Sequence, residues 1–389
     1  MAEIITTLFF HPEVGMRFNP NDPRDLSNDK FVLSKGHAAP ILYAAWAHTG
    51  IFPKEDLMKL RTIGSDLEGH PTPRLSFVDF ATGSLGQGMN NASGVAYSMK
   101  YFEKRHTKVY TLVGDGELAE GSNWEALHFA FIHKLDNFVG ILDCNRLGQS
   151  DATSLAHHLE IYEARIKAFG FYVQVIDGHN VEEIAAALKN AQAHEGGPSF
   201  IIAKTFKGKG CVDGIEDSLV LHGKPFGTHS KNVIDHIKSL IKNPDVHLTV
   251  REPVIEETKE EIIEHSVGEL HYKLGEKIST RMAFGNILKK LGDKDKLIVG
   301  LDADVKNSTF TDKLKAAHPD QFIDCYIAEQ SMAGVACGVS KRHRVPFAAT
   351  FAAFWTRAAD HIRMGAISQA NVKYIGTHAG ISIGTDGPS

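Results

Sequence analysis

A chain of 389 residues is longer than a single hydrophobic core usually organises, so its length predicts two domains. The net charge of −5 and the lack of a long basic run argue against binding to nucleic acid, and no apolar stretch approaches the length of a transmembrane helix. Residues 1–5 lack the basic segment and cleavage site of a signal peptide, and the four cysteines form no CxxC pair. We therefore expect a cytoplasmic protein with reduced thiols and with no nucleic-acid or membrane partner.

Helical and strand patterns alternate along the first two thirds of the chain. The expected elements, in chain order, are helices at 4–10 and 89–100, a strand at 109–113, a helix at 124–131, a strand at 138–143, a helix at 162–169, a strand at 171–176, a helix at 181–193 and a strand at 199–203. The strands are apolar runs of the kind that parallel sheets bury on both faces. The alternation predicts a doubly wound α/β domain.

Residues 243–276 differ in composition, because prolines and mixed charges replace large apolar side chains there, and we interpret this segment as a linker. A second α/β unit follows the linker. Its expected elements are a helix at 280–291, strands at 297–301 and 322–328, a helix at 331–340, a strand at 345–350, a helix at 356–368 and a strand at 372–376. Both chain ends are abrupt, so we expect the chain to be part of something longer.

The most informative motif is Gly114-Asp115-Gly116-Glu117, which Asn145 follows about thirty residues later. Asp115 and Asn145 each end an apolar strand, and a right-handed β-α-β crossover would bring both to one edge of the sheet. A carboxylate oxygen and an amide oxygen suit a hard divalent cation, and the flanking glycines let a diphosphate approach the backbone. An ordinary glycine-flanked turn is the alternative interpretation of the same residues.

Three histidines, His37, His70 and His222, each follow a glycine in an expected loop, which leaves their imidazoles accessible. An imidazole titrates near neutral pH and can move protons, although a single loop histidine is more often incidental. The glycine-rich run 83–88 precedes a helix, where backbone amides favour anions, or it serves only for close packing.

Several short motifs then occur in a characteristic order: Ser34–Ala39, Gly69–Pro71, Gly83–Gly88, Gly114–Glu117, Asn145–Leu147, Lys204–Gly208, His222–Pro225, Thr280–Arg281, Lys306–Thr309, Ala328–Gln330 and Phe351–Phe354. In this set and order the chain resembles transketolases of the animal type. The resemblance implies two parallel-sheet domains of the thiamine-diphosphate type. Residues 1–242 would form the diphosphate- and Mg-binding domain, 243–276 the linker, and 277–389 an incomplete pyrimidine-binding domain, with a third domain absent.

The implied reaction is the reversible transfer of a two-carbon ketol unit in the pentose phosphate pathway. The donor would be a ketose phosphate such as xylulose 5-phosphate, and the acceptor an aldose phosphate such as ribose 5-phosphate or erythrose 4-phosphate. The implied cofactors are thiamine diphosphate and Mg2+, with other divalent cations possible, because the cofactor supplies the chemistry and the protein binds and orients it. The resemblance also implies a homodimer with active sites shared between subunits.

The resemblance assigns roles to individual residues. Catalytic roles would fall to Glu329, His70 and His222, with Glu329 activating the aminopyrimidine of the cofactor. The metal ligands would be Asp115, Asn145 and the carbonyl of Leu147. Cofactor contacts would come from His37, Gly83, Ser84, Leu85, Gly116, Asn145, Lys207, His222 and Phe354. Substrate contacts would come from His222, Arg281, Ser308, His378 and Asp386.

Two other functions fit the same residues. One is a truncated, non-catalytic transketolase-like paralogue that binds the cofactor without turnover. The other is deoxyxylulose-phosphate synthase, which shares the cofactor and the Gly-Asp-Gly motif, although the Ser308 region and the Lys35–Ala39 segment favour transketolase. Since a substrate histidine and much of the fold would lie beyond the two ends, we expect no measurable ketol transfer from this chain by itself.

Overall fold

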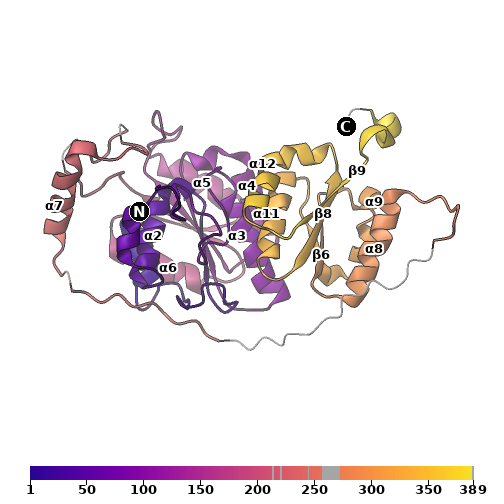
Figure 1. Cartoon of the computed structure of the whole chain (residues 1–389), viewed down its shortest axis with the longest axis horizontal. Helices are drawn as coiled ribbons and strands as arrows, with labels where there is room; N and C mark the ends of the chain where they lie inside the picture. Colours follow the sequence, from indigo (N-terminus) through magenta and orange to yellow (C-terminus); the bar gives the residue numbers. More distant parts are fainter. Residues whose placement is uncertain (213, 220, 244, 256–271, 388–389) are drawn as a thin grey trace.

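The computed structural model describes residues 1–212, 214–219, 221–243, 245–255 and 272–387, apart from the side chains of Ser382 and Asp386. Two parallel β-sheets lie side by side along the long axis of the molecule (Figure 1). The first sheet has five strands in the order β1-β2-β3-β5-β4, and the second has four in the order β7-β6-β8-β9. The predicted α/β architecture with two parallel sheets is confirmed.

Four of the five strands of the first sheet form where the hydrophobic pattern predicts them, whereas β1 was not predicted. Its strands are β1 (Lys30–Leu33), β2 (Val109–Gly114), β3 (Phe138–Cys144), β4 (Tyr172–Asp177) and β5 (Ser199–Lys204). Strands β2 and β3 are parallel neighbours, with Gly114 in register with Asp143. Their carboxyl ends therefore meet at one edge, and Asp115 and Asn145 follow directly.

Helices cover both faces of this sheet. Helices α3 (Gly88–Tyr97), α4 (Gly121–Ile132) and α5 (Leu159–Ala168) contribute to the core on one face. Helices α1 (Ala2–Phe10), α2 (Ala39–His48) and α6 (Val181–Ala193) contribute to the core on the other. A short π-helical turn, Ser98–Phe102, extends α3. Burial of apolar side chains on both faces explains why the central strands are continuously hydrophobic.

The second sheet differs from expectation at one functionally important point. Its elements are α8 (Thr280–Lys294), β6 (Ile298–Asp302), α9 (Lys306–Thr309), α10 (Asp312–Ala317), β7 (Phe322–Asp324), α11 (Glu329–Ser340), β8 (Val345–Phe351), α12 (Ala359–Ile367) and β9 (Lys373–Thr377). The strand expected at 322–328 ends at Asp324, because Tyr326 turns the backbone into the left-handed region at φ +56°. Glu329 is consequently the first residue of α11 and does not directly follow a strand, as the prediction had placed it.

The two domains meet where α3 crosses α11. A Cβ atom at Gly94 would overlap the backbone of Val335, and one at Gly338 would overlap the carbonyl oxygen of Asn91. Only glycine lets two helix backbones approach this closely, so these positions set the distance between the helices. The guanidinium of Arg342 pairs with Glu103 at the same boundary, and both side chains are buried.

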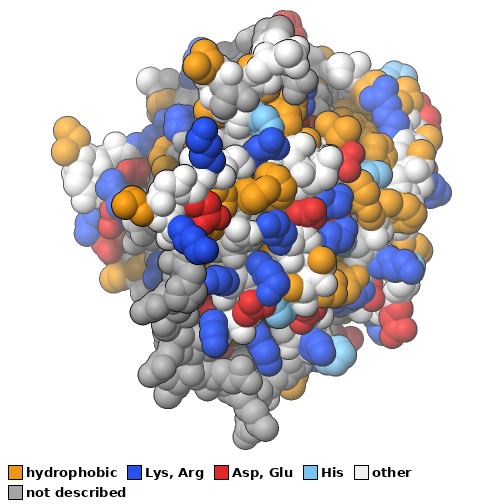
Figure 2. Space-filling model, turned by 90° about the vertical axis from the view of Figure 1, so that its right-hand side faces the viewer, with side chains coloured by type: hydrophobic (Ala, Val, Ile, Leu, Met, Phe, Trp, Pro, Cys, Tyr) orange, Lys and Arg blue, Asp and Glu red, His pale blue; other side chains and the backbone are white. Residues whose placement is uncertain are grey.

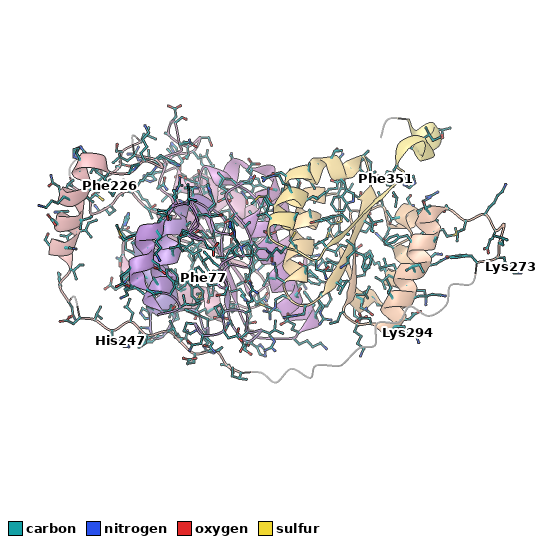
Figure 3. The ribbon with its side chains drawn as sticks, in the orientation of Figure 1. Phe77, Phe226, His247, Lys273, Lys294 and Phe351 are labelled. Atoms are coloured by element: carbon teal, nitrogen blue, oxygen red, sulfur yellow. The ribbon has the colours of Figure 1, made fainter. Side chains whose placement is uncertain are left out.

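Outside the cores, α7 (Ser230–Leu240) lies at the far end of the first domain beside Phe226 (Figures 1 and 3). In the expected linker, residues 244 and 256–271 lie outside the described part of the chain, and the domain boundaries stay a prediction. On the outer face of the second domain, Lys and Arg side chains alternate with Asp, Glu and apolar groups (Figure 2). Within the described ranges, none of the helices combines the length and apolar character needed to cross a bilayer.

Candidate functional site

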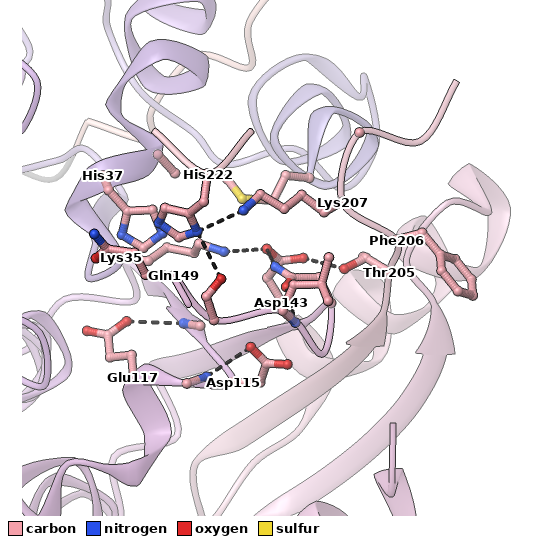
Figure 4. A pocket seen from close by; sticks show the side chains of 18 of the residues that line it. Lys35, His37, Asp115, Glu117, Asp143, Gln149, Thr205, Phe206, Lys207 and His222 are labelled. Carbon is pink, nitrogen blue, oxygen red and sulfur yellow. Dashed lines mark hydrogen bonds and ion pairs between the residues drawn. The ribbon is translucent and has the colours of Figure 1, made fainter. Parts of the chain in front are cut away.

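A cavity of about 630 Å³ opens at the carboxyl ends of β1, β2, β3 and β5 (Figure 4). This edge is where open α/β sheets bind ligands, because the loops that follow neighbouring strands converge there. Of the residues singled out in the sequence, the cavity is lined by His37, His70, Gly83, Leu85, Asp115, Gly116, Asn145, Leu147, Lys207 and His222. Segments up to 185 positions apart in the chain are thereby brought together, while the individual roles of these residues stay predictions.

Asp115 and Asn145 present oxygen atoms at the floor of the cavity. The carboxylate of Asp115 accepts hydrogen bonds from the backbone N–H of Gly116 (2.9 Å) and of Arg146 (2.6 Å). Burial raises the pKa of Asp115, and these two backbone hydrogen bonds act against that shift. The amide oxygen of Asn145 accepts from the N–H of Leu147 at 3.0 Å, which fixes its orientation.

This donor set fits a hard divalent cation. A carboxylate, an amide oxygen and the nearby carbonyl of Leu147 are hard oxygen ligands of the type that Mg2+ takes, together with phosphate oxygens and water. Among the described residues, no cluster of three or more His, Cys, Asp or Glu side chains is placed to hold a metal.

The sequence analysis missed a buried ion pair behind these oxygens. The ammonium of Lys35 lies 2.5 Å from Oδ2 of Asp143, and the hydroxyl of Thr205 donates to Oδ1 at 2.5 Å. Burial acts to raise the pKa of Asp143, but the positive charges of Lys35 and of the chain N-terminus, together with the hydrogen bonds from Lys35 and Thr205, hold that pKa well below its usual range. The only local signal was that Asp143 ends a predicted strand, since the strand before Lys35 was not predicted.

Glu117 belongs to the motif named in the sequence, but no role was predicted for it. Its carboxylate accepts from the hydroxyl of Ser34 (2.5 Å), the N–H of Gly86 (3.0 Å) and the N–H of Gly114 (3.1 Å). Burial raises the pKa of this side chain, and the three donors oppose the shift. Glu117 thus ties the segment after β1, the glycine-rich loop and the end of β2 together beneath the cavity.

One wall of the cavity is basic. The rings of His37 and His222 lie 5.4 Å apart between centroids, and Nζ of Lys207 lies 2.7 Å from Nδ1 of His222. Burial and the nearby positive charges, Lys35 first, lower the pKa of His37 to about 4. Burial likewise lowers the pKa of His70 and of His222. Near neutral pH these imidazoles are therefore uncharged, and burial also lowers the pKa of Lys207. The amino groups and imidazoles on this wall offer N–H donors to an anion.

Ser84 does not face the cavity with its side chain, although its neighbours Gly83 and Leu85 line it. Its hydroxyl donates to Asp360 at the start of α12, and Nε2 of Gln87 donates to the same carboxylate oxygen. The glycine-rich loop is therefore held between the cavity on one side and the second domain of the same chain on the other. Any contact of Ser84 with a ligand in this cavity would have to come from its backbone.

The predicted residues of the second domain do not line this cavity. Glu329 is 4% exposed and accepts a hydrogen bond of 2.7 Å from Nη1 of Arg357. Phe354 stacks on Phe351 with ring centroids 5.0 Å apart, and the ring of His378 lies 4.0 Å from Phe351, which Figure 3 labels. These residues form a separate group near the carboxyl end of β8.

Two of the residues that the resemblance assigns to the substrate, Arg281 and Ser308, lie next to each other. Nη1 of Arg281 donates to the backbone carbonyl of Ser308 at 3.1 Å, and its guanidinium lies over the ring of Phe310. The contact of Arg281 and Ser308 with a substrate stays a prediction. The side chain of Asp386 lies outside the described part of the structure.

Two protein-family models match the chain. They are the transketolase thiamine diphosphate binding domain, over residues 1–281, and the transketolase pyrimidine binding domain, over residues 276–389. Among curated proteins, the chain is 52% identical to the transketolase of Homo sapiens over 391 residues and 50% identical to Transketolase-like protein 2 of Mus musculus over 394 residues. Each comparison covers 100% of this chain and 62% of the relative, so the chain spans about three fifths of their length.

Among solved structures, the transketolase of Campylobacter jejuni superimposes with a TM-score of 0.79 at 29% sequence identity. That superposition covers 96% of this chain and 64% of the other. The sequence and structural comparisons therefore agree on one family across both sheets.

Proposed function

This chain belongs to the transketolase family, and on that premise we propose that its first domain binds thiamine diphosphate with Mg2+, or with another divalent cation, in the cavity of Figure 4. We propose further that the protein transfers a two-carbon ketol unit between sugar phosphates in the cytoplasm, as part of the pentose phosphate pathway. Xylulose 5-phosphate would be the donor, and ribose 5-phosphate or erythrose 4-phosphate the acceptor. The observation that carries the proposal is that the oxygen donors Asp115 and Asn145 line the same cavity as the basic wall around Lys207.

The oxygen donors and the basic wall of the cavity would bind different parts of the ligand. Asp115, Asn145 and the carbonyl of Leu147 would hold the cation, and Lys207 would face the diphosphate, whose negative charge offsets the positive wall. When bound, thiamine diphosphate supplies the electron sink for the carbanion that ketol cleavage leaves beside a carbonyl. The backbone of Gly116 is open enough for a phosphate to approach, because a Cβ there would meet only Thr153, at 3.4 Å.

The uncharged histidines would move protons. A neutral imidazole can accept a proton from a sugar hydroxyl and return it, which is what cleavage and formation of a carbon–carbon bond next to a hydroxyl require. His70 and His222 line the cavity with their pKa values lowered, so both are in the accepting state near neutral pH. We assign them the proton transfers to and from the substrate hydroxyls, and His37 a contact with the cofactor.

Glu329 would act in the cavity of a second copy of the chain. Within its own chain Glu329 does not line the cavity, and it is held buried beside Arg357. We propose that it donates or accepts at the pyrimidine of the cofactor bound by the partner, where Phe354 would stack on the ring and Arg281, Ser308 and His378 would contact the sugar phosphate. A homodimer is then required for a complete site.

A second candidate function is cofactor binding without turnover. The chain is 50% identical to Transketolase-like protein 2 and 52% identical to transketolase, so the experiment has to test both ketol transfer and cofactor binding without turnover. Thiamine diphosphate should be titrated into the purified chain by calorimetry with and without Mg2+, followed by a coupled assay with xylulose 5-phosphate and ribose 5-phosphate. Absence of Mg2+-dependent binding would refute the proposed function.

The assay separates the remaining possibilities. Binding with turnover supports the transferase and contradicts our expectation that this chain is inactive by itself. Binding without turnover, in the presence of a dimer, is expected both from the non-catalytic function and from a transketolase chain that is inactive by itself. It therefore supports cofactor binding alone. An added arm with pyruvate as the donor detects deoxyxylulose-phosphate synthesis, and product formation only in that arm would contradict transketolase.

A further inference from the structure

A chain of two hydrogen bonds connects helix α1 to the cavity through the imidazole of His179. Glu3 lies in the first turn of α1, and its Oε1 is 2.9 Å from Nδ1 of His179, which follows β4. On the other side of the ring, the backbone N–H of Phe206 donates to Nε2 of His179 at 2.9 Å. Glu3, His179 and Phe206 all line the cavity.

These contacts determine which ring nitrogen carries the proton. A backbone N–H can only donate, so Nε2 of His179 must present a lone pair to Phe206. The single proton of the neutral ring is then on Nδ1, where it donates to the carboxylate of Glu3. A protonated ring would point a second N–H at that of Phe206, so the contact with Glu3 is a hydrogen bond to a neutral imidazole and not an ion pair.

Phe206 occupies a position that matters for the cavity. Its neighbour Thr205 donates to Asp143 at 2.5 Å, and its other neighbour Lys207 lies 2.7 Å from His222. The N–H of Phe206 belongs to the peptide unit that joins Thr205 to Phe206, so holding it fixes the backbone immediately before Lys207. An anchored backbone at this point limits how far Lys207 can turn away from the cavity. His179 itself is well buried, with a side-chain exposure of 12%, so water competes poorly for its hydrogen bonds.

We propose that Glu3 and His179 are positioning residues: Glu3 selects the Nδ1–H form of His179, and His179 holds the backbone of Phe206 so that Lys207 faces the anion site. The effect on the ligand rests on the proposed function, because it assumes that Lys207 faces a diphosphate. The state of the His179 ring does not depend on that assumption. The two parts can therefore fail separately.

The first experiment determines which ring nitrogen of His179 carries the proton. Nitrogen-15 spectra of the full chain, labelled at histidine, should show His179 with its proton on Nδ1, and the His179→Gln variant identifies which signal belongs to it. In the Glu3→Ala variant, the preference of His179 for a proton on Nδ1 should weaken. Glu160→Ala is the matched control, because it removes the carboxylate partner of His158 in an exposed pair with side-chain exposures of 67% and 70%. A proton on Nε2 of His179 in the unaltered chain would overturn the proposal.

The second experiment measures the consequence for anion binding. Calorimetry with Mg2+ and inorganic pyrophosphate should show about a 5- to 10-fold weaker Kd for His179→Phe, which leaves the N–H of Phe206 without an acceptor. His179→Gln should stay within about 2-fold, since its side-chain oxygen can take the place of Nε2. His158→Phe should leave Kd unchanged.

A double-mutant cycle with Lys207→Met tests whether His179 affects anion binding through Lys207. If His179 acts through Lys207, His179→Phe should cost little further affinity in the Lys207→Met background. Additive losses would overturn the positioning role. Thermal unfolding of each variant checks that it is folded. If His179→Phe fails to fold, the Kd values of the His179→Gln and Glu3→Ala variants and the nitrogen-15 spectra test the proposal instead. Failure of the unaltered chain to bind pyrophosphate would refute the proposed function and leave the ring assignment standing.

Discussion

The ammonium of Lys35 lies 2.5 Å from the carboxylate of Asp143, and the two side chains are only 5% and 4% exposed. Lys35 follows β1 and Asp143 belongs to β3, so the pair spans β2 and joins the two sides of the cavity floor. Removing one partner of such a buried pair strongly destabilises the fold, because the other partner is left as a buried charge without compensation. Removing both partners together costs much less.

Lys35→Met should therefore lower the free energy of unfolding by about 3–5 kcal/mol, measured by urea denaturation. The double variant Lys35→Met/Asp143→Leu should lose clearly less, since no buried charge remains. Lys167→Met, at the exposed pair with Glu163, is the control and should change stability by less than about 1 kcal/mol. Equal losses in the single and double variants would contradict this account of the pair.

Asp115→Ala should abolish the Mg2+-dependent rise in Tm that we expect with thiamine diphosphate, because the variant lacks the one carboxylate in the proposed ligand set. Asp293→Ala, in which the removed carboxylate is exposed and pairs with Lys289, should keep the full shift. The measurement is thermal unfolding with cofactor, with and without Mg2+. An undiminished shift in Asp115→Ala would refute the metal assignment.

Gly338→Ala should destabilise the chain, and about 2–4 kcal/mol is the expected scale for backbone overlap at a tightly packed contact. The added Cβ would collide with the backbone of Asn91 where α11 crosses α3. Gly121→Ala is a matched control, since a Cβ at that helical position meets nothing within 4 Å. Chemical denaturation of the two variants compares them, and equal stabilities would show that the domains do not need this close approach.

His361→Leu should stabilise the chain by about 1 kcal/mol at pH 7, since both ring nitrogens are buried without a hydrogen-bond partner among the described residues. Burial lowers the pKa of His361 to about 4, although Asp360 acts to raise it. Below pH 6.5 the unfolded chain binds a proton that the folded chain resists, so this histidine costs stability progressively as the pH falls from 6.5 to 4.

The advantage of His361→Leu over the unaltered chain should therefore grow as the pH is lowered through that window. Urea unfolding at pH 7 and pH 5 measures it, and His158→Leu at the surface should show no such trend. A variant less stable than the parent at pH 7 would mean that His361 has a partner that the described structure lacks.

Local patterns predicted the helices and strands well where the apolar period was strong. Helix α6 was predicted at 181–193 and has those bounds, and β2 and β3 were each predicted to within one residue. The prediction was wrong after β7, because nothing in the apolar run 325–328 signals that Tyr326 adopts a left-handed backbone. Glu329 then begins a helix and pairs with Arg357, a partner that local spacing could not identify.

The sequence by itself determined the alternation of strands and helices, and with it the meeting of Asp115 and Asn145 at one sheet edge, because a β-α-β crossover has a preferred hand and few registers. Only the tertiary structure decided which charges pair and which proton states follow. Lys35 and Asp143 are 108 positions apart, and Glu3 and His179 are 176 apart. Contacts over such separations depend on how whole elements pack, and no local period encodes them.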